Sequence, residues 1–133
     1  MLKLKIADYC SQNLNTHFVD GGHIRDNIWI DFTEGGNGYR YDFVPTKEIW
    51  IGGVHIIEAP YIFIHEITEI TYAIENGLDI MKESDYSKAH EYASKSELAA
   101  RQSPNTVDKI IYEAVRDYER IIASEEQIIW QES

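Results

Sequence analysis

Three residues in one apolar segment have the types and spacing of a metal-binding helix. His65 and Glu69 are four residues apart, so in a helix they share a face and can direct a nitrogen and a carboxylate oxygen at one point. Glu66 lies about 100° round the helix from His65, within reach of a water molecule held at that point. His90, in a later segment, can supply a third ligand. This pattern is typical of a metal-dependent hydrolase, in which a free carboxylate stands beside two ligands one turn apart.

The donor types set the expected metal. Glu69 stands where the common helical zinc motif has its second histidine, but two histidines and one glutamate also form catalytic zinc sites. Because a carboxylate is a harder ligand, it widens the choice toward Mn²⁺ or iron. We therefore expect Zn²⁺, or another divalent metal such as Mn²⁺, bound by His65, Glu69 and His90, with Glu66 as the general base. The alternative is a buried hydrogen-bond network without an ion, with His90 as a polar residue at a helix contact.

Glu97 is the reserve ligand in this prediction. It follows His90 by seven residues, which places it on the same helix face but about 10 Å further along the axis. We therefore expect Glu97 to pair with Arg101 and to replace His90 only if that imidazole faces solvent. Tyr72 and Tyr86 are candidate donors to a developing oxyanion, although with nine tyrosines in the chain packing is the favoured role for each.

Composition excludes several classes of partner. The net charge of −11, from 23 acids and 12 bases, argues against free nucleic acid as a ligand. No apolar run is long enough to span a bilayer, and the first residues lack the apolar stretch of a signal peptide, so we expect no membrane association. A single cysteine, Cys10, rules out an internal disulfide framework and fits a reducing compartment.

The 133 residues suit one domain that is mainly β over residues 1–57 and mainly α over residues 58–133. Alternation of apolar and polar residues predicts strands at 28–32, 39–44 and 48–51, with an edge strand at 54–57. Asp20 to His23 indicates a turn, and four-residue apolar spacing indicates a short helix over residues 2–14.

The second half carries three helical patterns. One covers residues 59–76, with Pro60 in its first turn and Gly77 as its left-handed terminator. The next begins at residue 84 or 85 and continues to about 102, and a third begins at Ser103 and Pro104. The predicted fold is α+β, a small mainly antiparallel β-sheet followed by three α-helices, with the metal site between the first two helices. The apolar tail at residues 128–130 is suited to docking on the body or on a second subunit.

Four sequence blocks carry a resemblance to a known family: residues 30–39, residues 48–51, the His65-Glu66-x-x-Glu69 motif and residues 86–97. Together they resemble a family of small proteins of bacteriophages and prophages that is similar to zincin-type metallopeptidases. The resemblance covers residues 15–102 and implies a zincin-like fold in a phage-encoded protein of the host cytoplasm or the virion. The positions that match the family's polar pattern are His65, Glu66, Glu69, His90 and Glu97, while Asn37 stands where relatives often have histidine.

Three functions fit these observations. The first is a metal-dependent hydrolase, most simply a peptidase that acts on a peptide or protein substrate, with the strand at 48–51 holding an extended peptide. The second is a non-catalytic zincin-like protein, in which a metal or a hydrogen-bond network only joins two helices. The third is an acidic interaction protein, for example an inhibitor of a host nucleic-acid-binding defence protein. A homodimer or a complex with a host protein is compatible with all three.

Overall fold

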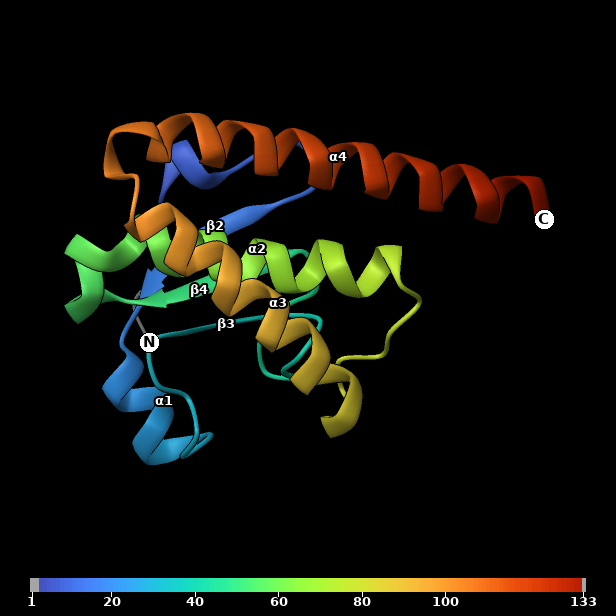
Figure 1. Cartoon of the computed structure of the whole chain (residues 1–133). Helices are drawn as coiled ribbons and strands as arrows, with labels where there is room; N and C mark the ends of the chain where they lie inside the picture. Colours follow the sequence, from blue (N-terminus) through green and yellow to red (C-terminus); the bar gives the residue numbers. More distant parts are fainter. Residues whose placement is uncertain (1–2, 133) are drawn as a thin grey trace.

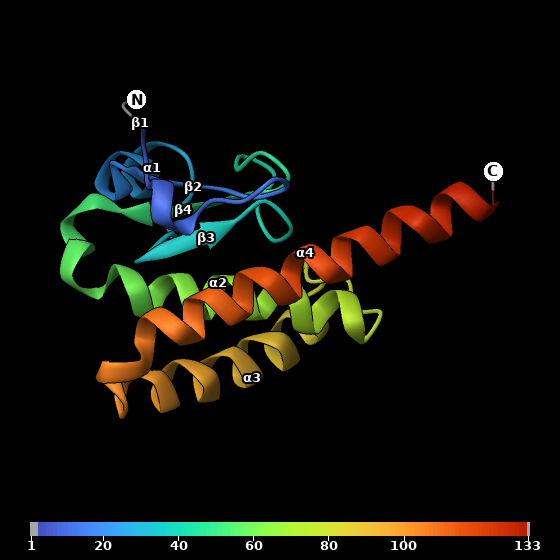
Figure 2. The same cartoon turned by 90° about the horizontal axis from the view of Figure 1, so that it is seen from above.

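A mixed four-stranded sheet packs against a layer of three long helices (Figure 1, Figure 2). The computed structural model describes residues 3–132, and side chains as far as residue 125. The strands lie in the order β1-β2-β4-β3. Their bounds are β1 (Lys3–Lys5), β2 (Asn15–Val19), β3 (Gly35–Asn37) and β4 (Glu48–Gly52). Because β2 and β4 run parallel while the two outer pairs are antiparallel, the α+β class is confirmed but the mainly antiparallel sheet becomes a mixed one.

The first α-helix lies inside the half that was predicted to be mainly β. It is α1 (Gly21–Asn27), and the side chain of Asp20 accepts a hydrogen bond from the His23 N–H at 3.0 Å. The turn predicted at this point is therefore a helix N-terminus. An aspartate followed by two glycines is compatible both with a turn and with the capped start of a helix, so the sequence pattern alone does not distinguish them. With α1 included, the described residues form four α-helices instead of three.

Three of the predicted strands are wrong. Residues 28–32 follow α1 as a loop, in which the Trp29 N–H bonds back to the Ile24 carbonyl at 2.8 Å. Residues 39–44 form turns, because the Asn37 carbonyl accepts hydrogen bonds from the N–H groups of Arg40 and Tyr41. Residues 54–57 belong to the 3₁₀-helix η2 (Gly53–Glu58), since β4 already has a neighbour on each side and offers no edge to a further strand.

The N-terminal segment also differs from its prediction. Residues 2–14 were expected to form a short helix, but they hold β1 and the 3₁₀-helix η1 (Ala7–Tyr9). Pairing with β2 decides the outcome, because Leu4 lies opposite Phe18 and the Ile6 N–H bonds to the Thr16 carbonyl at 2.8 Å. A sheet neighbour thus overrides a weak helical spacing.

The long helices follow the sequence pattern closely. They are α2 (Ala59–Glu75), α3 (Glu83–Arg101) and α4 (Val107–Glu132), the last preceded by the 3₁₀-helix η3 (Pro104–Thr106). Gly77 ends α2 with a φ of 63°, as predicted for a left-handed terminator. Ala89, Ala93 and Ala100 are fully buried, and their small side chains let α3 approach its neighbours closely.

Helix α2 is the centre of the molecule, with the sheet on one side and α3 and α4 on the other (Figure 2). The main core joins its apolar side chains to β4 and α4 and includes Ile49, Ile51, Phe63, Ile67 and Tyr118. A second core forms where α1 and the loops pack on Trp50 of β4. Within the described residues no helix is long and apolar enough to cross a membrane. The side chains of the predicted docking tail, residues 128–130, lie outside the described part.

Candidate metal centre

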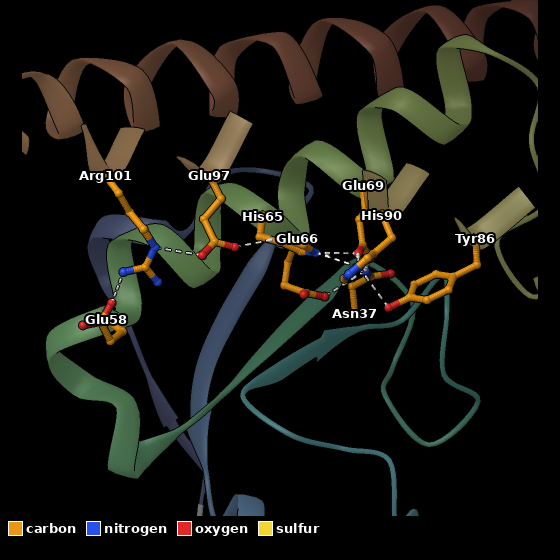
Figure 3. Close-up of polar contacts among 9 residues, drawn as sticks. All are labelled: Asn37, Glu58, His65, Glu66, Glu69, Tyr86, His90, Glu97 and Arg101. Carbon is orange, nitrogen blue, oxygen red and sulfur yellow. Dashed lines mark hydrogen bonds and ion pairs between the residues drawn. The ribbon is translucent and has the colours of Figure 1, made fainter. Parts of the chain in front are cut away.

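The candidate site lies where α2, α3 and β3 meet (Figure 3). Helix α2 contributes His65, Glu66 and Glu69, which are buried because the helix is apolar around most of its circumference. Helix α3 contributes His90, and the edge strand β3 contributes Asn37. The structure thus brings together the three ligands and the general base that the sequence predicts.

Three donor atoms form a small triangle at this point. The His65 Nε2 lies 2.7 Å from the Glu69 Oε2 and 3.0 Å from the His90 Nδ1, and the third side of the triangle is 2.8 Å. Ligand atoms on a tetrahedral zinc ion with bonds of about 2.0 Å lie roughly 3.3 Å apart. An ion would therefore need only a small outward movement of each side chain, and this donor set could hold one.

Glu97 fixes the orientation of the His65 ring from its other side. The His65 Nδ1 lies 2.9 Å from the Glu97 Oε1, and the Arg101 Nε donates to the Glu97 Oε2 at 2.8 Å. Arg101 also pairs with Glu58, which completes a chain of charges from the start of α2 to the imidazole (Figure 3). With Nδ1–H donating to Glu97, the Nε2 lone pair faces the triangle, as metal-binding histidines commonly require.

Glu97, the reserve ligand of the prediction, lies outside the triangle of donor atoms. Its carboxylate meets the nitrogen of His65 that points away from the triangle, and its predicted pairing with Arg101 is present. The His90 side chain is 48 % exposed, yet its Nδ1 still points at Glu69. The exposed side of His90 leaves a solvent-facing approach to the triangle, which is typical of a catalytic site and not of a closed structural one.

The protein supplies excess negative charge to the triangle. Burial alone would lower the pKa of His65, but its hydrogen bond with Glu69 and the nearby carboxylates outweigh burial and raise the pKa to about 9. Burial would raise the pKa of Glu69, but hydrogen bonds with His65 and His90 lower it instead. The cluster therefore favours a positive charge at its centre, whether a proton or a metal ion.

Glu66 has the environment of a general base. Burial, followed by the charge of Glu69, raises its pKa to about 8, so its protonated form prevails at neutral pH, and a cation held nearby would favour the carboxylate form that a general base requires. The Asn37 Nδ2 donates to the Glu66 Oε1 at 3.1 Å and lies 3.4 Å from the Glu69 Oε1. Glu66 and His65 both line a cleft of about 250 Å³, which gives a substrate access to the pair.

Asn37 is the site residue whose contact with the two glutamates the sequence did not reveal. It is fully buried, and its Oδ1 accepts hydrogen bonds from the N–H groups of Tyr39 at 3.0 Å and Arg40 at 3.1 Å. These bonds fix the amide so that its NH₂ faces the glutamates. The signals in the sequence were its place between two glycines and the resemblance, in which relatives often have histidine at this position, and neither shows which helix the side chain meets.

The two tyrosine candidates separate in the structure. The Tyr86 hydroxyl lies 3.3 Å from the His90 Nδ1 and lines the cleft. Tyr72 instead stacks on Tyr92 with ring centroids 4.4 Å apart, which is a packing role. Tyr86 is therefore the tyrosine that can reach a substrate.

The strand proposed to hold a substrate also needs correction. β4 lies between β2 and β3, so both of its edges are already paired. β1 and β3 are the edge strands, and the first residue of β3, Gly35, lines the cleft. An extended peptide would have to pair with β3.

No family model matches this chain, and no curated protein or solved structure matches it either. The zincin-like part of the predicted fold therefore stays a prediction, and the site is interpreted from its own geometry.

Proposed function

We propose that the protein is a divalent-metal-dependent hydrolase of peptide bonds, with Zn²⁺ as the first metal to test. The supporting observation is the convergence of His65, Glu69 and His90 within hydrogen-bond distance of one another, beside the buried carboxylate of Glu66. Two histidines and a glutamate with an open solvent side match the ligand set of known catalytic zinc sites.

The chain's own residues have clear roles in this proposal. A bound ion would supply a Lewis acid and a more acidic water molecule. Glu66 would take a proton from the attacking water and pass it to the leaving amine, while Asn37 holds the Glu66 carboxylate in place. Tyr86 donates to the oxyanion that develops on the scissile carbonyl, since its hydroxyl lies beside His90.

The position of Gly35 supports a peptide as the substrate. Gly35 begins the edge strand β3, is only partly buried and lines the cleft, so its backbone groups are placed to pair with an extended chain. We include a zincin-like relationship and a phage-encoded role in the proposal. Their support is the sequence resemblance together with a metal-binding helix that lies next to an edge strand.

Replacement of Glu66 by glutamine tests the mechanism directly. We expect Glu66→Gln to bind Zn²⁺ as the wild type does and to cleave a casein or random-peptide substrate at least about 100-fold more slowly. Glu91→Gln is the matched control, because Glu91 is an exposed glutamate of α3 that pairs with the exposed Lys95. Elemental analysis of protein purified without a metal-affinity column gives the metal content. Cleavage by Glu66→Gln at the normal rate would contradict the mechanism.

A second candidate function has its own supporting observation. His65, Glu69 and His90 already satisfy one another through hydrogen bonds, so they can join α2 to α3 without any turnover. This non-catalytic candidate predicts that metal binding changes stability while no peptide in a diverse library is cleaved. A library digest followed by mass spectrometry separates the two.

A further inference from the structure

A second cavity, with three aromatic side chains, one methionine and three charged residues in its walls, lies beside the metal cleft. It measures about 480 Å³, and its walls include Trp29, Tyr41, Phe43 and Met81; we call it the aromatic pocket. The Tyr41 and Phe43 ring centroids are 5.1 Å apart, and those of Trp29 and Tyr41 are 6.1 Å apart. Trp29 is 46 % exposed and Met81 is 45 % exposed, so large apolar surfaces face this cavity's opening and water.

Two connections join the aromatic pocket to the metal cleft. Tyr41 lines both cavities, so they share a wall. Arg40, also in the pocket wall, lies with its guanidinium 4.0 Å from the centroid of the Tyr86 ring, and the Tyr86 hydroxyl contacts His90. Because the two cavities share Tyr41, a peptide bound in the metal cleft could place a neighbouring side chain in the pocket.

We propose that the aromatic pocket binds a large apolar side chain of the peptide whose backbone lies at the metal centre. This inference rests on the proposed function and names the substrate class: peptides with phenylalanine or a similarly large apolar residue near the cleaved bond. Aromatic walls provide extensive contact area, and the flexible methionine lets the pocket accept side chains of different shapes.

The negative charge around both cavities determines which residues of the peptide are favoured next to that apolar side chain. Asp31 and Glu34 line the cleft, and Asp42 lines the pocket. The positive charge of Arg40 is matched by Glu83, whose Oε2 lies 3.0 Å from its Nη2. Basic residues beside the apolar one are therefore favoured, as the net charge of −11 also indicates.

NMR titration of metal-free protein, kept in chelator, tests the pocket without reliance on turnover. The probes are three capped tripeptides with the sequences Lys-Phe-Lys, Lys-Ala-Lys and Glu-Phe-Glu. We expect Lys-Phe-Lys to shift the Trp29 indole N–H and the Met81 methyl signals saturably. Lys-Ala-Lys should bind about tenfold more weakly or worse, because the apolar contact is lost. Glu-Phe-Glu should also bind more weakly, in a salt-dependent way.

Variants locate the binding. Trp29→Ala and Met81→Asp should each weaken Lys-Phe-Lys binding about tenfold, and Met81→Asp changes only an exposed side chain, so its fold is expected to persist. Leu98→Ala, at an exposed apolar residue of α3, is the control and should bind normally.

Several outcomes would overturn the inference. These are equal binding of Lys-Phe-Lys and Lys-Ala-Lys, equal binding of the basic and acidic peptides, or Trp29 shifts that depend on protein concentration alone, which would make a second copy the occupant. Saturable binding in a protein that shows no metal-dependent cleavage would instead reject the proposed function and leave a peptide-binding pocket.

Discussion

At the residue scale, the imidazole of His65 connects the acidic cluster to the rest of the protein. One ring nitrogen faces Glu69 and His90, and the other faces Glu97. The i and i+4 spacing within one helix made the His65 and Glu69 pair predictable, because both belong to the same local structure. Asn37 was not predictable as their neighbour, since it comes 29 residues before Glu66 and reaches it only through the register of β3.

The contact between Glu97 and His65 gives a prediction of metal affinity. Glu97→Gln keeps a hydrogen-bond acceptor but removes the charge that makes the His65 Nε2 a stronger donor to a metal. We expect its Zn²⁺ affinity to fall about tenfold or more, measured by competition with a chromophoric chelator. Glu91→Gln should bind as the wild type does, and unchanged affinity in Glu97→Gln would show that this carboxylate does not tune the site.

At the scale of elements, the long helices were predictable, and of the four strands predicted in the β half only the one at 48–51 is confirmed, as β4. A helix of 17 residues such as α2 repeats its apolar pattern over several turns, whereas a strand of three residues such as β3 offers almost no pattern. Residues 28–32 alternate like a strand, yet Ile28, Trp29 and Ile30 are exposed because the Asp20 cap starts α1 and the chain leaves the sheet. The hydrogen bonds of the nearby cap and turns, and not the alternating pattern, therefore determine the structure of these residues.

The close approach of Gly38 to Pro45 supports the position of Asn37. A Cβ at Gly38 would lie 2.1 Å from the Pro45 carbonyl oxygen, and both partners are backbone, so neither can move cheaply. We expect Gly38→Ala to lower the free energy of unfolding by about 1–3 kcal/mol or more, and to weaken Zn²⁺ binding by displacing Asn37. Urea unfolding measures the change.

Gly22→Ala is the matched control for Gly38→Ala. Its Cβ would meet only the Asp20 Oδ1, at 3.5 Å, which is ordinary contact. A stability at or above that of the wild type is expected there, because alanine favours a helix more than glycine does. Similar losses in both variants would rule out the backbone clash as the cause.

Glu119 attaches helix α4 to the N-terminal segment that precedes β2. This carboxylate accepts hydrogen bonds from the Ser11 hydroxyl at 2.6 Å and from the Asn13 N–H and side-chain NH₂ at 2.7 and 2.8 Å. Burial alone would raise its pKa, but these bonds outweigh it and hold the pKa of Glu119 below its ordinary value. The stabilisation is therefore fully present above the unfolded-state pKa and is lost as pH falls through the folded-state pKa.

We expect Glu119→Gln to lower the free energy of unfolding by about 1–2 kcal/mol at pH 7, because glutamine cannot accept all three bonds as a charged group. The difference from the wild type should disappear in acid, when both side chains are neutral. Urea unfolding at a series of pH values measures it, with Glu113→Gln, at an exposed residue of α4, as the control. A difference that persists unchanged into acid would contradict the role of the charge.

At the scale of the whole molecule, the candidate metal site lies between α2 and α3, the two helices that pack most extensively against each other. A ligand that binds only the folded state stabilises it by about 2.7 kcal/mol at 100 times its Kd. We therefore expect Zn²⁺ to raise the Tm of the wild type and chelator to lower it, by calorimetry. Glu69→Gln should lose most of this response, because Glu69 contacts both His65 and His90. An equal Tm shift in Glu69→Gln would place the ion elsewhere.

The exposure of His90 has a kinetic consequence. A competing chelator could approach a bound ion from the exposed side of His90 while two buried side chains still hold the ion. Removal of the ion by the chelator would then not require the protein to unfold. Exchange with free metal should then be fast, and the metal found after purification will reflect the last buffer more than the cell. Occupancy is best fixed by supplying the ion at a controlled free concentration during every assay.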